Sequence, residues 1–371
     1  MRSTRAALVA AGLGLALSLA ACGQNAAAPS SSGGGSAAPA ATGAKVGVIL
    51  PETASSARWE GFDKPLLTQA MQAAGLQADI QNAQGDEQKF STLADSMITS
   101  QVKVLVIASI SSESGAAVAA KAKAQGIPVI DYDRLNLGGT SDYYVSFDNV
   151  KVGELQGQGL VDCLKAKNVT KPVIAELNGS QTDNNATLFK QGYDSVLKPL
   201  YDSGQLVKGP DQWVDGWDNA KAGTIFEQML TENKNIKGVL AANDGLGNAA
   251  ISILKKNKLN GQVPVTGQDA TTQGLQNILV GDQCMTVYKA IKQEADAAPQ
   301  LAVAIAKGQK PTSATGTVTD PESKKSVPSV LLTPKAITKD NVKDVIADGF
   351  VTKDELCTSA FAKACTDAGI S

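Results

Sequence analysis

Eight side chains able to bind a polyhydroxylated ligand stand shortly after apolar runs of this sequence. They are Arg58, Trp59, Asp133, Arg134, Asn185, Trp217, Asn243 and Asp269. Carboxylates accept hydrogen bonds from hydroxyl groups, arginine donates hydrogen bonds to hydroxyl oxygens, and asparagine does both. The face of an aromatic ring covers the apolar C–H face of a sugar ring. Together these residue types predict a site for a neutral sugar.

Taken singly, these signals have plainer interpretations. Residues 183–185 (Asp-Asn-Asn) fit the start of a helix, where such side chains cap backbone N–H groups. Asp133 and Arg134 together fit a surface turn, and a tryptophan such as Trp213 fits a core position. The prediction therefore depends on the whole set and not on any one member.

The elements that must position this set alternate between short apolar runs and segments of helical periodicity. The first set of runs is 46–50, 78–82, 104–108 and 128–132, with helical segments at 60–74, 86–100 and 114–125. The second set of runs is 173–177, 207–212, 239–242 and 263–267. This alternation predicts an α/β fold with two Rossmann-like lobes, each a parallel sheet flanked by helices. Ligands of such sheets bind outside the carboxyl ends of the strands, where the eight side chains fall.

The composition excludes several classes of function. The chain has no histidine, which removes histidine general bases, histidine triads and histidine-ligated metals. Its 34 basic and 36 acidic side chains lack the basic excess of a nucleic-acid-binding protein. We therefore expect no catalytic residue, no metal, no cofactor and no nucleic-acid partner.

The first 44 residues have the composition of a targeting segment. Arg2 and Arg5 precede an uninterrupted run of small and apolar residues, 6–21, which is too short for a membrane span but suits a signal peptide. The run ends at Cys22 in a sequence that resembles a bacterial lipobox, although a signal peptide with an unmodified cysteine is the alternative. Residues 23–44 read as a flexible linker. We expect export and lipid attachment to the outer face of the cytoplasmic membrane.

Four further cysteines allow three disulfide pairings. We favour Cys163 with Cys284 and Cys357 with Cys365. The second pair would lie about 12 Å apart on an unbroken helix, too far to bond, so it requires the last helix to begin after Cys357.

Several longer phrases resemble the D-xylose-binding branch of the sugar-binding proteins of bacterial ABC importers, within the type I periplasmic-binding-protein superfamily. They lie at 57–59, 131–134, 145–156, 183–186, 209–217, 267–270 and 285–289, so the resemblance covers about 45–356. It implies two lobes hinged by three crossovers near 146–149, 288–290 and 327–333. The first lobe would hold 45–146 with 290–326, and the second would hold 147–289 with 327–371.

The resemblance also implies roles for individual residues. Arg58 and Arg134, with Asp133 beside them, would bind from the first lobe. Trp59 and Trp217 would form aromatic walls. Asn185, Asn243, Asp269 and also Lys289, which the resemblance alone singles out, would bind hydroxyls from the second lobe or the hinge. Asn184 and Asp244 are interpreted as caps or supports.

Three rival functions are weighed against a monomeric sugar-binding protein that serves an ABC permease. Residues 243–250 loosely imitate a dinucleotide-binding loop, and Asp133 with Asp269 could suit a glycoside hydrolase. A related transcription regulator would need a DNA-binding module in place of the signal segment. The third rival is a sensor subunit for a signalling kinase. It would use the same sugar-bound, closed form, so the sequence does not distinguish it from a transport protein. The polar loop 320–325 and the tail 356–371 receive no role.

Overall fold

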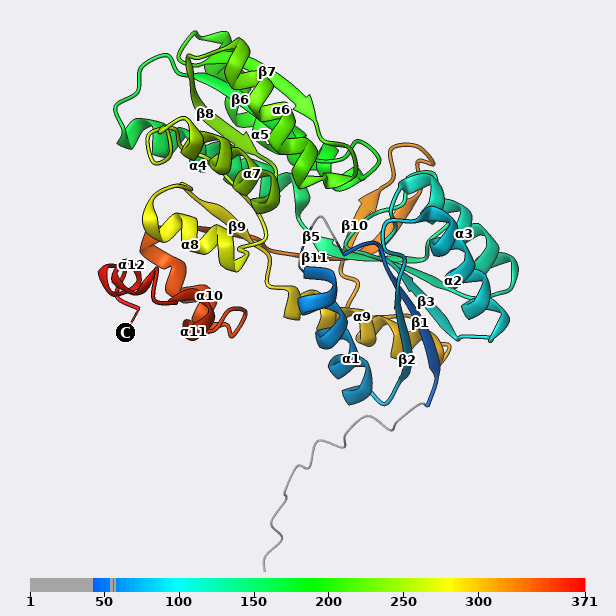
Figure 1. Cartoon of the computed structure of the whole chain (residues 1–371). Helices are drawn as coiled ribbons and strands as arrows, with labels where there is room; N and C mark the ends of the chain where they lie inside the picture. Colours follow the sequence, from blue (N-terminus) through cyan, green and yellow to red (C-terminus); the bar gives the residue numbers. More distant parts are fainter. Residues whose placement is uncertain (1–42, 54–55, 57, 371) are drawn as a thin grey trace, which may run out of the picture. The chain divides into compact units, whose positions relative to one another are not determined.

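A computed structural model describes residues 43–53, 56 and 58–370. The predicted signal segment, nearly all of the linker and Cys22 lie outside the described residues. The described chain contains a seven-stranded sheet in the order β10-β11-β5-β4-β3-β1-β2, which we call the sheet of the first lobe (Figure 1). Its strands are β1 (Lys45–Leu50), β2 (Gln77–Asn82), β3 (Val104–Ile107), β4 (Val129–Tyr132), β5 (Tyr143–Phe147), β10 (Gly316–Thr319) and β11 (Ser326–Leu332). All neighbouring pairs are parallel except β10 with β11.

Both faces of this first sheet are covered by helices. The helical elements are η1, a π-helix (Trp59–Asp63), α1 (Lys64–Ala73), α2 (Glu87–Thr99), α3 (Ser112–Ala124) and α9 (Ile291–Ala306). Val104 and Val106 of β3 pack in the cluster formed with α1 and α9. Leu105 and Ile107 pack in the cluster formed with α2 and α3. Since neighbouring side chains of a strand face opposite sides, an all-apolar strand needs such cover on both faces.

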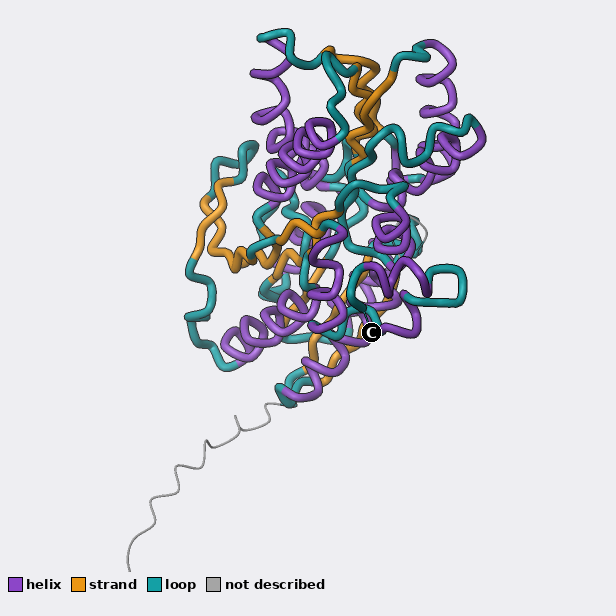
Figure 2. The backbone as a smooth tube through the Cα atoms, turned by 90° about the vertical axis from the view of Figure 1, so that its left-hand side faces the viewer, coloured by secondary structure: helices purple, strands orange, loops and turns teal. Residues whose placement is uncertain are grey.

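The second lobe is built on the sheet β7-β6-β8, again with helices on both sides (Figure 2). Its elements are α4 (Asn149–Ala166), β6 (Val173–Asn178), α5 (Asn184–Asp202), β7 (Val207–Trp213), η2 (Asp215–Trp217), α6 (Asn219–Glu232), β8 (Ile236–Ala241), α7 (Asp244–Lys256), α8 (Thr272–Val280), β9 (Thr286–Tyr288) and β12 (Lys335–Ile337). An isolated bridge joins Val239 to Val265, and β9 pairs with β12. The fold predicted from the sequence, two α/β lobes with parallel sheets, is confirmed.

The chain ends in a group of short helices that pack against α8. They are η3 (Lys339–Asn341), α10 (Val342–Ala347), α11 (Lys353–Leu356) and α12 (Ala362–Asp367). Cys357 bonds to Cys365 with 5.9 Å between their Cα atoms, and α12 begins after Cys357, as this pairing requires. Cys163 bonds to Cys284. These are the two pairs favoured from the sequence.

The third crossover lies within the range 327–333 that the resemblance implies, but the boundary between the lobes differs from the expected position at 327. Residues 326–332 form β11, which pairs with β5 inside the first sheet, so the chain enters the second lobe after Leu332 and not at 327. The first crossover follows Phe147, within the range 146–149 that the resemblance implies. The loop 320–325 is the turn of the β10–β11 hairpin. A strand with alternating burial carries a weaker apolar signal than a doubly covered one, which explains the shifted boundary.

Candidate functional site

All nine predicted ligand-binding residues line one cavity of about 30 Å³. Most of them follow the carboxyl end of a strand, so the sheets of both lobes bring together residues that are far apart in sequence. Ser56, Asp183, Phe189 and Gln268 complete the lining, and the sequence prediction did not assign them. Asp183 and Gln268 directly adjoin predicted segments, whereas Phe189, inside α5, carried no signal beyond that of a core residue.

Arg58 forms the most heavily bonded part of the cavity wall. Its Nε and Nη2 donate to the two oxygens of Asp63, each at 2.8 Å. Its Nη1 donates to Asp133 at 2.7 Å, and Nη2 also donates to Glu294 at 2.9 Å. Burial alone would lower the pKa of Arg58, but the charges of Asp133, Asp63 and Glu294 outweigh it and raise that pKa. The guanidinium is thus fixed in place, with one N–H on Nη1 beyond those these contacts use.

The three carboxyl groups around Arg58 differ in their titration. Burial raises the pKa of Asp63, against the effect of Arg58. Burial and the charge of Asp133 raise the pKa of Glu294. Burial also acts to raise the pKa of Asp133, but Arg58 and other nearby cations overcome it and lower that pKa. Asp133 is therefore the carboxylate that stays charged and can accept from a ligand hydroxyl.

Asp133 joins the two lobes. Asn185 of the second lobe donates from Nδ2 to the backbone oxygen and to Oδ1 of Asp133, both at 3.0 Å. Asn149 in turn donates to Oδ1 of Asn185 at 2.9 Å. The backbone of Asp133 is left-handed, with φ of 64°, which turns the chain sharply after β4. The lobes are therefore in contact through the polar side chains of the site itself.

A second contact between the lobes joins Arg134 to Trp217 through Asp183. Arg134 Nε lies 3.0 Å from Asp183 Oδ2, and Trp217 Nε1 donates to the same oxygen at 3.1 Å. Gly179 allows this placement, because a Cβ there would lie 2.1 Å from Cη2 of the Trp217 ring. Trp59 is 2% exposed and has Arg58 above its ring, 4.3 Å from the centroid. Both tryptophans predicted as walls are cavity walls.

The remaining side of the cavity combines Asn243, Gln268, Asp269 and Lys289. Asn243 uses Oδ1 to cap α7 at the N–H of Leu246, which leaves its amide NH₂ for other partners. Lys289 is 3% exposed, with Nζ 3.4 Å from Asp269 and 3.6 Å from Asp133. Gln268 donates to Asp269, while its buried Oε1 has no protein partner among the described residues. A buried polar atom of this kind normally has a hydrogen-bond partner, so it marks a place for a ligand group.

Asp244 and Asn184, interpreted from sequence as caps or supports, do not line the cavity. Asp244 is fully buried and accepts hydrogen bonds from Thr271, Gln283 and Thr286. Burial raises its pKa to about 7. Asp244 therefore ties the start of α7 to the segments carrying Asp269, which is a supporting role.

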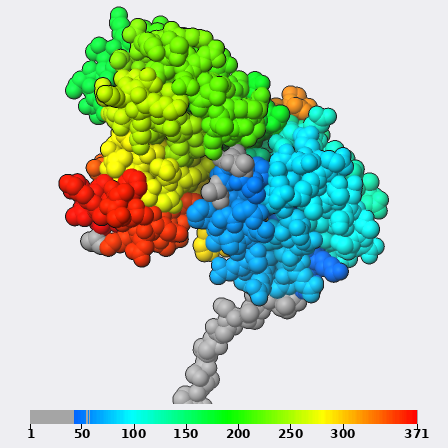
Figure 3. Space-filling view, in the orientation of Figure 1, coloured from blue at the N-terminus to red at the C-terminus, as the bar shows by residue number. Residues whose placement is uncertain are grey.

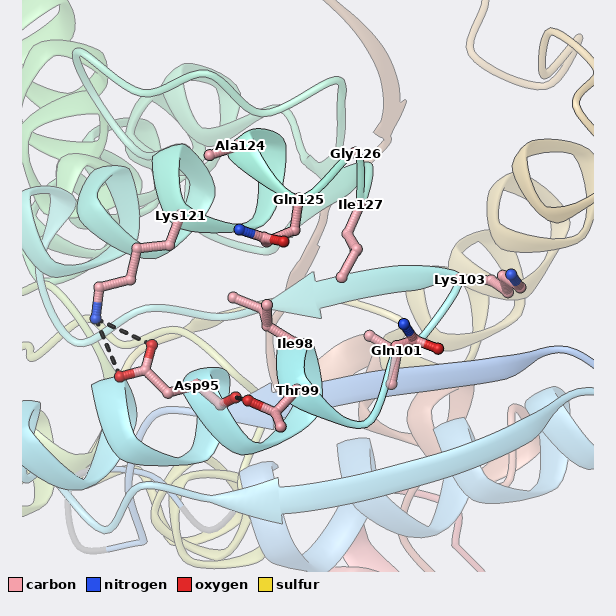
Figure 4. Close-up of a pocket in the computed structure, with 11 residues that line it drawn as sticks. Asp95, Ile98, Thr99, Gln101, Lys103, Lys121, Ala124, Gln125, Gly126 and Ile127 are labelled. Atoms are coloured by element: carbon pink, nitrogen blue, oxygen red, sulfur yellow. Dashed lines mark hydrogen bonds and ion pairs between the residues drawn. The ribbon is translucent and has the colours of Figure 1, made fainter.

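A larger cavity lies elsewhere, between the ends of α2 and α3 (Figure 4). It has a volume of about 810 Å³, and Lys121 pairs with Asp95 across one end of it. None of the predicted site residues lines this cavity, and no tryptophan lines it. It lies within the first lobe alone, so it lacks the arrangement expected for a sugar between two lobes.

Two further properties concern only the described part of the chain. It contains no group of three or more cysteine or acidic side chains placed to hold a metal ion. It also contains no helix that is both long and apolar enough to cross a membrane.

Comparison with known proteins places this architecture in a family. Residues 46–310 match the family described as periplasmic binding protein domain. The D-xylose-binding periplasmic protein of Escherichia coli K12 is 41% identical over 301 residues, 81% of this chain and 88% of that protein. The multiple sugar-binding periplasmic receptor ChvE of Rhizobium radiobacter is 38% identical over 82% of this chain and 89% of its own length.

Solved structures agree with the sequence relatives. An ABC transporter solute-binding protein from Clostridium phytofermentans with bound β-D-glucose superimposes with a TM-score of 0.77 at 30% identity, covering 84% of this chain and 99% of that one. A carbohydrate transporter solute-binding protein from Chloroflexus aurantiacus in complex with D-glucose gives 0.75 at 32% identity, covering 84% and 97%. With its two lobes, its cavity between them and these relatives, the chain belongs to the periplasmic-binding-protein family.

Proposed function

We propose that this chain is the sugar-binding subunit of an ABC importer and that it captures D-xylose or a close analogue. The observation that carries the proposal is the cavity to which both lobes contribute donors, acceptors and a tryptophan. The names of the relatives, a D-xylose-binding protein and a multiple sugar-binding receptor, support a monosaccharide as the ligand. Since the family consists of binding proteins, the chain is a binding protein and not an enzyme.

Each wall would contact a different part of the sugar. The remaining N–H of Arg58 and the ammonium of Lys289 would donate to hydroxyl oxygens. Asp133, Asp269 and Oε1 of Gln268 would accept from hydroxyl groups. The tryptophan rings would cover the C–H faces of the sugar ring. A sugar lacking one hydroxyl would leave a buried partner unpaired, at a cost of about 1–3 kcal/mol.

Binding would be coupled to movement of the lobes. The cavity is small, about 30 Å³, and side chains of the two lobes are in contact across it, so a sugar ring enters only when the walls separate. The contacts of Asp133 with Asn185 and of Arg134 with Asp183 would break on opening and form again around the ligand. Sugar would favour the closed form because only that form supplies hydrogen bonds from both sides.

The location of the protein belongs to the same proposal. The segment ending at Cys22 would direct export, and a lipid on Cys22 would hold the receptor at the outer face of the cytoplasmic membrane beside its permease. The alternative of a sensor subunit for a signalling kinase shares this site and this closure.

Calorimetry against a panel of pentoses and hexoses tests the ligand. We expect D-xylose to bind most tightly, and the absence of binding for every sugar in the panel would refute the proposal. Arg134→Ala should weaken binding more than tenfold, because it removes the positive charge that pairs with Asp183 across the two lobes. Lys121→Ala, at the large cavity of the first lobe, is the matched control and should leave the affinity unchanged. Labelling with radioactive palmitate, lost in Cys22→Ala, tests the anchor.

A further inference from the structure

The C-terminal segment, residues 335–370, belongs mainly to the second lobe. Val342, Val345 and Leu356 pack with residues of α8 in one apolar cluster. Gln276 of α8 donates to the backbone oxygen of Leu356 at 3.2 Å. The Cys357–Cys365 disulfide joins the end of α11 to α12. Figure 3 shows the segment in orange and red beside the yellow surface of α8. The segment itself lies beyond residue 310, where the match to the family model ends.

Phe350 of this segment reaches the first lobe. The Phe350 ring stacks on the ring of Phe62, with 4.2 Å between centroids and 20° between planes. Phe350 also packs against Tyr288 at 5.2 Å, and the Tyr288 hydroxyl donates to Asp348 at 3.1 Å. Tyr288 is the last residue of β9 and directly precedes Lys289 of the sugar site. The contact therefore lies where the chain crosses between the lobes.

Phe62 lies in the element that carries the first wall of the sugar site. The π-helix η1 begins at Trp59, directly after Arg58, and ends at Asp63, which holds the Arg58 guanidinium. Phe62 faces away from that cavity and lines a separate cavity of about 290 Å³ with Phe350 and Tyr288. π-helical turns are rare and occur frequently at functional sites. One short turn thus presents the sugar-binding residues on one side and Phe62 on the other.

The geometry points to Phe62 and Phe350 as positioning residues that latch the two lobes in the sugar-binding arrangement; this inference rests on the proposed function. Phe62 is fixed to the first lobe through η1, and Phe350 is fixed to the second through α8. An opening that moves η1 away from Tyr288 would separate the two rings. The stacked pair therefore favours the closed form and holds η1 against the hinge residue Tyr288.

The test combines sugar binding with a measurement that needs no sugar. Phe350→Ala and Phe62→Ala should each weaken sugar binding by about 2- to 10-fold, the range expected for an aromatic pair. The loss should come from faster dissociation, because the latch acts in the closed form. The double variant should lose no more sugar affinity than the single variant with the larger loss, since both substitutions remove the same contact. Phe350→Tyr, which keeps the ring, should restore binding, and Phe361→Ala in the same segment is the matched control.

Small-angle scattering of the sugar-free protein supplies the independent measurement. Phe350→Ala and Phe62→Ala should increase the radius of gyration relative to wild type, whereas Phe361→Ala should not. Equal affinity and equal radius in wild type and both single variants would overturn the latch, as would additive losses in the double variant. A wild-type protein that binds no sugar would refute the proposed function, and the scattering comparison would still decide the latch.

Discussion

Replacing Arg58 by alanine is the sharpest perturbation that the site offers. The side chain is 4% exposed and pairs with Asp63, Asp133 and Glu294, which are themselves buried. Alanine leaves these carboxyl groups together without their main counter-charge. Removing one partner of a buried ion pair costs about 3–5 kcal/mol, and we expect a loss of unfolding free energy in that range near neutral pH.

The pH dependence of this loss follows from the pKa values. Without the guanidinium, the pKa values of Asp63 and Glu294 in the folded variant rise further above the unfolded values of about 3.9–4.3, and the pKa of Asp133 loses the main cause of its lowering. Groups with a raised folded pKa lose their stabilising contribution as the pH rises through that pKa. The difference in unfolding free energy between wild type and Arg58→Ala should therefore be small near pH 4 and grow toward about pH 7.5.

Urea unfolding at about pH 5 and about pH 7.5 measures both quantities by linear extrapolation. Lys64→Ala is the control, because Lys64 pairs with Glu60 at 2.9 Å on the exposed surface of α1. An exposed pair contributes about 0–1 kcal/mol, so this variant should change little at either pH. A loss below about 1 kcal/mol for Arg58→Ala at the higher pH, or a loss independent of pH, would refute the reasoning.

Three further changes test other parts of the structure. The raised pKa of Asp244, about 7, means that its contribution to stability is complete below about pH 4 and lost as the pH rises through about 7. In urea unfolding, the advantage of wild type over Asp244→Asn should therefore shrink by about 2 kcal/mol between about pH 5 and 8, and a constant difference would contradict the assignment. Gly179→Ala should displace the Trp217 ring, because the added methyl group would overlap it. The unfolding free energy should fall by about 1–3 kcal/mol in thermal unfolding, and calorimetry should show weaker sugar binding. Unchanged tryptophan fluorescence together with unchanged sugar affinity would contradict this prediction. Replacing Cys357 and Cys365 together by alanine should lower the unfolding free energy by about 2.5 kcal/mol, as expected for a disulfide between residues eight positions apart. An unchanged urea midpoint would show that this disulfide does not stabilise the fold.

Much of the site could be predicted because of one property of parallel sheets. Their strands end at the same edge, so a residue that follows one strand lies near residues that follow the others. Arg58, Asp133 and Asp269 each follow an apolar run, and this local signal was enough to place them in one cavity. Lys289 has no such signal and was found only through the resemblance of its neighbours.

The supporting residues could not be predicted in this way. Glu294 is 236 residues from Arg58 in sequence and lies in the first turns of an otherwise ordinary helix. Asp63 follows Arg58 by five residues, but only the π-helical turn of η1 aims its carboxylate at the guanidinium. The Phe62–Phe350 contact likewise joins segments that share no local pattern. Contacts of this kind depend on how elements pack, which periodicity does not encode.

The sequence by itself determined the alternation of strands and helices, the division into two α/β lobes and the residue types at the strand ends. These are local properties, set by apolar periodicity and by which side chains follow each strand. The tertiary structure decided which charges surround Arg58, that β11 completes the first sheet, and that the C-terminal segment reaches across to η1. These features depend on burial and on the distances between remote segments. Those distances follow from the packing of the whole chain.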